Sequence, residues 1–566
     1  MMAFILRRRL LLFFLLINSS VFGQQYSAPL DIKMLLSGTF GELRENHFHS
    51  GIDIKTNGIE GQKVFAIAEG YVSRIKVSAW GYGKALYINH PDGRTSVYAH
   101  LQKFNGRIDS IVKVEHYKKE KFELNFYPNK NTIKIRKGEV IALSGNSGGS
   151  SGAHLHFEIR NTKTEHPINP LQFGFKIDDN IAPTLKKVKI YTFGNSSIDD
   201  STKSKIYNLK KNNNTYQLDK TPTIFGDFAL GIYTYDKLNG THNKNGIYSI
   251  KLTIDSTLIY AFKVDELNFS TSRYINAHID FTEKKESKNK YHRCYKLPHN
   301  KLSNYTTLIG DGIISFDDND LHLIKLEVAD IFGNISNLTF KVQATKTATE
   351  KTVIKTVAAV NEFSFFKPNI FKRKDFELHM EANSLYEPLN FTYNTEDSVE
   401  SVFGVVHQVH TDKIPVHKKY VLSIKASIPS GIDDKVYIAK KDKNNNFWYM
   451  GGSWRNGFLR TKVREFGDFC IVADTIQPEI KGVNIYPGKT FNTQTTIKCT
   501  INDKQSGIKS YRAELDGKWI LMDYDYKRKL LRFDIEKNIS KGEHTFTLKV
   551  IDNVGNAADY SAEFTY

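Results

Sequence analysis

Short runs of alternating apolar and polar residues recur along the chain, whereas apolar residues at helical spacing are scarce. In residues 545–550, for example, phenylalanine, leucine and valine alternate with two threonines and a lysine. A period of two puts the apolar side chains on one face, which is typical of a half-buried antiparallel strand. Gly-Asn pairs between such runs supply turn residues. The pattern predicts an all-β protein.

The chain also contains an internal repeat. Residues 183–191 match residues 478–486 in register, and residues 326–334 match residues 548–556. Each copy would supply the opening strand and a late hairpin of one module, so we predict two immunoglobulin-like β-sandwiches, the first with insertions. The expected boundaries are 24–175 for an N-terminal domain, 178–345 and 474–566 for the two sandwiches, 346–358 for a linker, and 359–473 for a further β-rich module.

Residues 1–23 have the parts of a secretory signal peptide: arginines at 7–9, an apolar run at 10–17, and small residues before Gln24. The apolar run is too short to cross about 30 Å of hydrocarbon. We therefore expect export with cleavage before Gln24, and a periplasmic or extracellular location at the cell envelope.

Composition limits the partners and the cross-links. The 79 Lys and Arg residues exceed the 61 Asp and Glu residues, which gives a net charge of +18. The basic residues form no stripe, so nucleic acid is not the expected partner of an exported chain. A weak attraction to anionic wall or membrane surfaces is the alternative, as a peripheral association with the envelope. Three cysteines allow at most one disulfide.

Two patterns in the N-terminal domain place polar, metal-ligating residue types on one face of a strand. In residues 49–55, isoleucines alternate with Asp53, so Asp53 points away from the core, and His49 lies on the same side of the extended segment. In the second pattern, His154 and His156 share one strand face, opposite apolar neighbours. Two imidazoles side by side are costly to bury unless they are paired or bind a metal.

Two histidines and one aspartate form a three-ligand site with positions left open for water. This is the ligand set of catalytic zinc, and also of the non-haem iron oxygenases. Two further histidines, His154 and His100, would then not be needed as metal ligands. Such groups can take a proton from water and later donate one to a leaving amine. Spare imidazoles beside a metal favour a zinc hydrolase over an iron oxygenase.

At these residues the chain resembles peptidase family M23, the lysostaphin-like or LytM-type zinc endopeptidases. The His-x-Gly-x-Asp motif of the family stands at residues 49–53, Tyr-Ala-His-Leu at 98–101, and His-x-His at 154–156. The resemblance covers about residues 40–170, with the motifs in family order. It implies an antiparallel β domain with the site in a groove, one Zn²⁺ per chain, and a peptidoglycan or peptide substrate.

The same resemblance implies the role of each site residue. His49, Asp53 and His156 correspond to the zinc ligands, and His100 and His154 correspond to the catalytic histidines. The chain is expected to cleave peptide bonds in peptidoglycan stems or cross-links. The alternatives are a non-enzymatic LytM-like regulator, or a wall-binding scaffold or adhesin of the cell envelope.

Three further expectations concern the surroundings of the site. The stretch between His100 and His154 is longer than in the minimal family domain, and the additional segment, about 104–132, is expected to form a flap or an added hairpin. The Gly- and Ser-rich segment 144–152 is expected to line the groove. Residues 178–566 are expected to position the enzyme rather than to supply catalytic groups.

Overall fold

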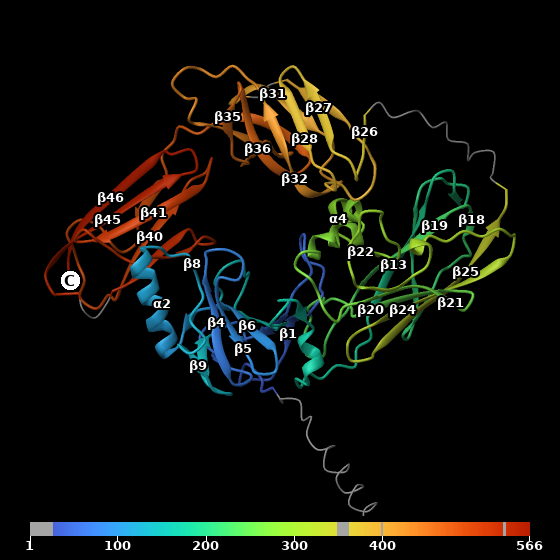
Figure 1. The fold of residues 1–566 in the computed structure, drawn as a ribbon, viewed down its shortest axis with the longest axis horizontal. Helices are drawn as coiled ribbons and strands as arrows, with labels where there is room; N and C mark the ends of the chain where they lie inside the picture. Colours follow the sequence, from blue (N-terminus) through green and yellow to red (C-terminus); the bar gives the residue numbers. More distant parts are fainter. Residues whose placement is uncertain (1–25, 348–360, 398–399, 536–538) are drawn as a thin grey trace, which may run out of the picture.

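The computed structural model describes residues 26–347, 361–397, 400–535 and 539–566 (Figure 1). The predicted signal peptide and residues 348–358 of the predicted linker lie outside these ranges. In the described residues strands far outnumber helices, which confirms the predicted all-β fold class. No helix in these ranges is long and apolar enough to cross a membrane. All three cysteines are buried and free.

The N-terminal domain combines a nine-stranded and a three-stranded sheet around one hydrophobic core. The large sheet runs in the order β1-β2-β11-β6-β5-β4-β8, with β12 beside β11 and β9 beside β4, and the small sheet is β3-β10-β7. The strands are β1 (Leu36–Gly38), β2 (Ile52–Lys55), β3 (Lys63–Phe65), β4 (Gly70–Val77), β5 (Lys84–Asn89), β6 (Arg94–Leu101), β7 (Lys103–Phe104), β8 (Leu124–Phe126), β9 (Lys134–Ile135), β10 (Val140–Leu143), β11 (His154–Asn161) and β12 (Pro167–Ile168).

The additional segment at 104–132 is not a hairpin. It forms helix α2 (Gly106–Lys119) followed by strand β8, which pairs with β4 at the sheet edge. Only Ile108, Val112 and His116 of the helix are buried. So narrow an apolar stripe gives little helical periodicity, and this is why the sequence pattern did not predict the helix.

Each downstream module packs sheets over its own core. In residues 184–345 a four-stranded and a nine-stranded sheet share one core. Two five-stranded sheets follow, and then a four-stranded and a five-stranded sheet. The immunoglobulin-like identity of the two repeat modules and the predicted boundaries stay predictions.

The first downstream module contains β13 (Thr184–Thr192), β14 (Ser197–Ile198), β15 (Lys205–Asn208), β16 (Lys210–Asn212), β17 (Thr215–Gln217), β18 (Thr223–Phe225), β19 (Phe228–Tyr235), β20 (Ser249–Ile254), β21 (Thr257–Lys263), α3 (Ile275–His278), α4 (Phe281–Ser287), β22 (Tyr291–Arg293), β23 (Tyr305–Leu308), β24 (Leu321–Ala329) and β25 (Ile335–Thr345). The second contains β26 (Glu362–Phe363), β27 (Asn369–Arg373), β28 (Phe376–Met380), β29 (Leu389–Asn390), β30 (Tyr393–Glu396), β31 (Val402–Val409), β32 (Pro415–Ile424), β33 (Val436–Lys441), β34 (Phe447–Tyr449), β35 (Ser453–Arg455), β36 (Phe458–Glu465) and β37 (Gly467–Ala473). The third contains β38 (Glu479–Gly482), β39 (Lys489–Thr490), β40 (Thr496–Asn502), β41 (Ile508–Leu515), β42 (Lys518–Trp519), β43 (Asp523–Asp525), β44 (Leu530–Asp534), β45 (Glu543–Asp552) and β46 (Ala557–Thr565).

The four units follow one another around a ring, so the C-terminal module returns to the N-terminal domain beside α2 (Figure 1). Two ion pairs join them, Arg512 to Glu120 at 2.8 Å and Lys84 to Asp523 at 2.5 Å. Two aromatic pairs add to this contact: the rings of Trp80 and Tyr526 lie 3.7 Å apart, and those of Tyr117 and Trp519 lie 5.2 Å apart.

Removing these contacts should open the ring. We expect the double variant Tyr526→Ala/Asp523→Lys to raise the radius of gyration measured by small-angle X-ray scattering, because it removes a stacked ring and replaces an attraction by a repulsion. Tyr486→Ala/Asp559→Lys, which changes exposed positions of the same module, is the matched control and should leave the radius unchanged. An equal radius for both double variants would contradict closure through this contact.

Candidate metal centre and its groove

Strand register brings the predicted metal ligands together. Strand β2 pairs antiparallel with β11, so that Asp53 lies opposite His156. His49 precedes β2, and its backbone exchanges hydrogen bonds with residues 41 and 42. The isoleucines of β2 are fully buried on the core side of the sheet, as the alternation predicts. The three polar side chains meet on the opposite face.

The three side chains surround one point. Their nearest ligand atoms all lie within 4.8 Å of one another. Asp53 Oδ1 is 3.1 Å from His49 Nε2 and 2.9 Å from His156 Nδ1, and the two ring nitrogens are 3.0 Å apart. All three residues are buried. Nothing but a proton or a cation can stabilise three electron-rich atoms held so close together.

The outer ring nitrogens of both histidines are already engaged. His49 Nδ1 donates to the Thr39 carbonyl at 2.8 Å, and His156 Nε2 donates to Glu158 Oε1 at 2.8 Å. Each bond fixes the tautomer whose lone pair points to the centre, which is how proteins orient imidazole ligands of metals. The donor set of two imidazoles and a carboxylate therefore fits Zn²⁺.

Electrostatics support the same conclusion. Burial lowers the pKa of His156, but the hydrogen bonds to Asp53 and Glu158 outweigh it and raise the pKa to about 9. For Asp53, burial raises the pKa, while His49 and the hydrogen bonds from the histidines hold it well below its usual range. The protein alone therefore favours a positive charge at this point, and a bound cation would take the place of the proton.

Sequence reasoning missed the groups that support the ligands. Glu158 is fully buried, and its second oxygen accepts a hydrogen bond from Arg160 Nε at 2.6 Å. Burial raises the pKa of Glu158, but Arg160 and His156 together hold it far below its usual value. Arg44 Nη2 contacts Asp53 Oδ2 at 2.9 Å, which leaves Oδ1 for a metal. The His-x-His-x-Glu-x-Arg alternation was the available signal for Glu158 and Arg160.

The two predicted catalytic histidines stand next to this centre. The rings of His100 and His154 lie 4.8 Å apart, and His100 lies 5.8 Å from the ring of His156. His100 has a φ of 57°, a backbone conformation that non-glycine residues rarely adopt. It is the penultimate residue of β6. The structure thus brings all five predicted residues together.

The ring nitrogens of both catalytic candidates have defined neighbours, and Nε2 of His154 lies 3.4 Å from Asp53 Oδ1. His100 Nδ1 donates to the Ser147 carbonyl at 2.9 Å, and His154 Nδ1 donates to the Gly152 carbonyl at 2.9 Å. These bonds leave Nε2 of each ring as a proton acceptor. Burial, and then the neighbouring His156 and His154, lower the pKa of His100 to about 3, so His100 is neutral at physiological pH.

The centre opens into a groove of about 1430 Å³. Residues 149–152 line it, as predicted for the Gly- and Ser-rich segment. Downstream modules line it as well, which the sequence did not indicate. Phe269 and Arg273 come from the first of them, and Arg464 from the next. The groove is therefore a composite of three modules. Lys and Arg residues outnumber Asp and Glu residues among those that line it.

The C-terminal module reaches the loop that orients the catalytic candidates. Lys527 Nζ donates to the Ser150 carbonyl at 2.9 Å. The side chain of Ser150 lies 3.2 Å from His154 Nδ1, and the Ser147 carbonyl in the same loop accepts from His100. Ring closure thus fixes one rim of the groove.

Two family models match parts of the chain. The model described as "Peptidase family M23" matches residues 47–118, which include His49, Asp53 and His100. The model described as "Zu5-like domain" matches residues 360–474, the module for which the sequence had suggested only β structure.

Curated relatives match over only about a fifth of the chain. The chain is 32% identical over 123 residues to an "Uncharacterized metalloprotease" of Haemophilus influenzae and to the "DD-carboxypeptidase/endopeptidase Mpg" of Neisseria meningitidis, covering 22% of this chain and 20% and 22% of theirs. It is 31% identical over 125 residues to the "Murein hydrolase activator NlpD" of Escherichia coli, of which it covers 26%. The chain thus spans only about a fifth to a quarter of the length of these relatives. The solved catalytic domain of lysostaphin from Staphylococcus simulans matches with 22% identity and a TM-score of 0.19, over 25% of this chain and 91% of that one.

The outer hydrogen bond to Glu158 should tune metal affinity. We expect Glu158→Gln to weaken zinc binding by about 10–100-fold, because the imidazole of His156 loses its charged partner. His49→Ala, Asp53→Ala and His156→Ala should each remove most of the metal. Metal content after dialysis against graded chelator measures both effects. Glu139→Gln, which changes a half-buried glutamate of the same domain that does not line the groove, is the control. Wild-type affinity in all four site variants would contradict the assignment.

Proposed function

The chain carries a domain of peptidase family M23, and from this premise we propose that it is an exported zinc endopeptidase that hydrolyses peptide bonds in peptidoglycan stems or cross-links. The observation that carries the proposal is the convergence of five residues in one groove. Three of them, His49, Asp53 and His156, would hold the zinc. The other two, His100 and His154, stand beside them, with their rings 4.8 Å apart.

The hydrogen bonds of the two histidines indicate which ring nitrogen of each would take part in the reaction. Zinc at the centre would supply Lewis acidity, which polarises a scissile carbonyl and lowers the pKa of water towards about 7. One of His100 and His154 accepts the proton of the attacking water at Nε2, because its Nδ1 is already committed to a backbone carbonyl. The resulting imidazolium donates that proton to the leaving amine. The other imidazole would need a proton on Nε2 to donate a hydrogen bond to the developing oxyanion.

The walls of the groove favour an acidic peptide. Arg44, Lys244, Arg273 and Arg464 line it from three modules. Peptidoglycan stems carry free carboxylates, which such a surface attracts and orients. The basic groove is consistent with the substrate class that the names of the Mpg relatives indicate.

A second candidate function is the regulation of other wall hydrolases. It is favoured by the 31% identity to the protein named "Murein hydrolase activator NlpD". A regulator needs no complete set of ligands and proton acceptors, whereas this groove has both. The two functions differ in whether the purified chain releases peptides by itself.

The catalytic histidines provide the decisive test. We expect His100→Ala and His154→Ala to keep their zinc and to lose about 10²–10⁴ in turnover, the usual cost of lost acid–base catalysis. Mass spectrometry of fragments released from purified peptidoglycan measures turnover and identifies the bond. His166→Ala, whose side chain pairs with Glu266 outside the groove, is the matched control. If both variants and the wild type release equally few fragments, the activator function holds instead.

The basic wall should act on binding rather than on chemistry. We expect Arg464→Ala to raise KM for a carboxylate-bearing stem peptide with little change in kcat, and to weaken the salt dependence of kcat/KM. Lys462→Ala, an exposed cation two residues away that does not line the groove, should leave both unchanged. An unchanged KM in the Arg464 variant would exclude this wall from substrate binding.

A further inference from the structure

Each of the two repeat modules gathers three aspartates around one point. In both groups a carboxylate oxygen of every member lies within 4.8 Å of the others. The groups occupy matching positions of the internal repeat. The first aspartate lies four residues before the proline of the repeat, the second begins an Asp-Lys-x-x-Gly segment, and the third lies three residues before the Gly-Asn pair. The first group is Asp179, Asp236 and Asp330, and the second is Asp474, Asp503 and Asp552.

The two groups are built by the same backbone contacts. The third aspartate of each, Asp330 or Asp552, accepts hydrogen bonds at Oδ1 from the backbone N–H groups two and four residues later. The first aspartate, Asp179 or Asp474, accepts from a backbone N–H in the Asp-Lys-x-x-Gly segment at 3.3 and 3.0 Å. These contacts fix the carboxylates but leave their negative charge uncompensated.

Unpartnered polar atoms point to a missing ligand at the first group. Asp236 is only 2% exposed, and its Oδ1 has no hydrogen-bond partner. Asn245 is 3% exposed, and neither its side-chain oxygen nor its nitrogen has one. The backbones of these two residues exchange both hydrogen bonds, so their side chains lie on the same face. Asp236 and Asp330 line a cavity of about 20 Å³, which is the size for one small ion or water.

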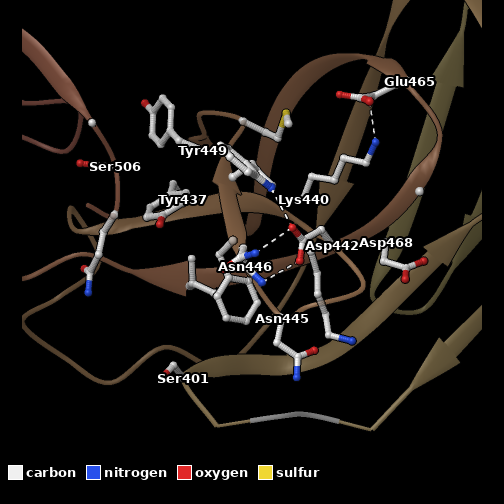
Figure 2. Close-up of a pocket in the computed structure, with 18 of the residues that line it drawn as sticks. Ser401, Tyr437, Lys440, Asp442, Asn445, Asn446, Tyr449, Glu465, Asp468 and Ser506 are labelled. Carbon is white, nitrogen blue, oxygen red and sulfur yellow. Dashed lines mark hydrogen bonds and ion pairs between the residues drawn. The ribbon is translucent and has the colours of Figure 1, made fainter. Parts of the chain in front are cut away.

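The second group shows the same feature. Asp474 and Asp552 are fully buried, and Ser506, 2% exposed, has a hydroxyl without a partner beside them. Ser506 and Asp503 also line a cavity of about 1340 Å³ between the last two modules, so solvent reaches this group. Figure 2 shows Ser506 at the edge of that cavity, with Tyr437 nearby.

The charges in both groups repel one another. Burial, and then Asp330 and Asp179, raise the pKa of Asp236 to about 8. Burial and the neighbouring Asp474 and Asp552 raise the pKa of Asp503 as well. No cationic side chain is among the largest influences on the pKa of these two carboxyls. A bound cation would compensate the repulsion between the carboxylates of each group.

Both groups lie where a repeat module meets the unit before it. Leu238, two residues after Asp236, belongs to the core of the N-terminal domain, and Phe332, two residues after Asp330, packs against that core. In the last module Val554, two residues after Asp552, packs against a buried cluster of the Zu5-like module. The two aspartate groups thus occupy equivalent joints between successive units of the ring.

We propose that the two groups are Ca²⁺ sites, each of which locks a repeat module to the unit that precedes it. All available donors are oxygens, which suit a hard cation with six to eight flexible ligands. Zinc prefers nitrogen and sulfur donors, which neither group provides. The first site also fixes the loop from Asp236 to Asn245, whose Lys244 lines the zinc groove. Calcium therefore acts on the shape of the groove and not on the chemistry in it.

Direct binding tests the proposal, whether or not the groove hydrolyses peptides. The full chain is stripped of metal, given one equivalent of zinc, and titrated with terbium, which replaces calcium on oxygen ligands and luminesces by energy transfer from tyrosine. We expect two sites that calcium displaces, with calcium affinities of about 10⁻⁴–10⁻³ M, the range of extracellular modules. Calcium at about ten times this concentration should raise Tm by roughly 2–4 °C, whereas magnesium should not.

Two isosteric variants assign the sites. Asp236→Asn and Asp503→Asn should each remove one terbium site and reduce the calcium-dependent rise in Tm, because the amide keeps the shape and loses the charge. Asp317→Asn and Asp559→Asn, exposed aspartates of the same modules outside both groups, should bind two ions as the wild type does. A wild-type chain whose Tm and terbium luminescence do not respond to millimolar calcium would overturn the proposal, and the carboxyls would then share protons instead. Retention of two sites in both isosteric variants would overturn it as well.

Discussion

The pairing of β2 with β11 is the constraint on which the rest of the structure depends. It sets Asp53 opposite His156 and leaves the apolar residues of both strands in the core. A slip of one residue would send every side chain of a strand to the other face, turning a candidate ligand into the core and the apolar residues of that strand out of it. The hydrophobic effect that stabilises the sheet therefore also enforces the geometry of the metal centre. Stability and site assembly come from one register.

The sequence predicted well which residues meet at the candidate metal centre, because short local patterns place them on the strand faces. Period-two alternation distinguishes Asp53 from its isoleucine neighbours and places His154 and His156 on one face. The five candidate residues are all in motifs of three to five residues, and the structure gathers them in one groove. The same alternation places Glu158 on the face of His156. That the two side chains form a hydrogen bond is known only from the distance between their atoms.

What the sequence did not predict depends on contacts between distant segments. The carbonyl of Thr39 selects the tautomer of His49, and no sequence pattern in residues 39–49 predicts this hydrogen bond. Helix α2 was missed because most of its surface faces solvent and too little of it is apolar. In the sequence, Arg273 and Arg464 are indistinguishable from ordinary surface cations. Only the arrangement of the modules in the ring places them at the groove. Side chains from other modules can be assigned to a site only after the modules have been placed.

The composite groove changes what the downstream modules do. The five candidate residues of the centre all come from the N-terminal domain. Yet the downstream modules form the basic wall of the groove, and through Lys527 they contact the loop that carries the partners of His100 and His154. The downstream modules are therefore coupled to the candidate catalytic residues through backbone carbonyls. A shift of residues 146–152 would move the carbonyls that accept hydrogen bonds from Nδ1 of His100 and His154. Each joint of the ring, although far from the metal centre, then affects how rigidly the two proton acceptors are held.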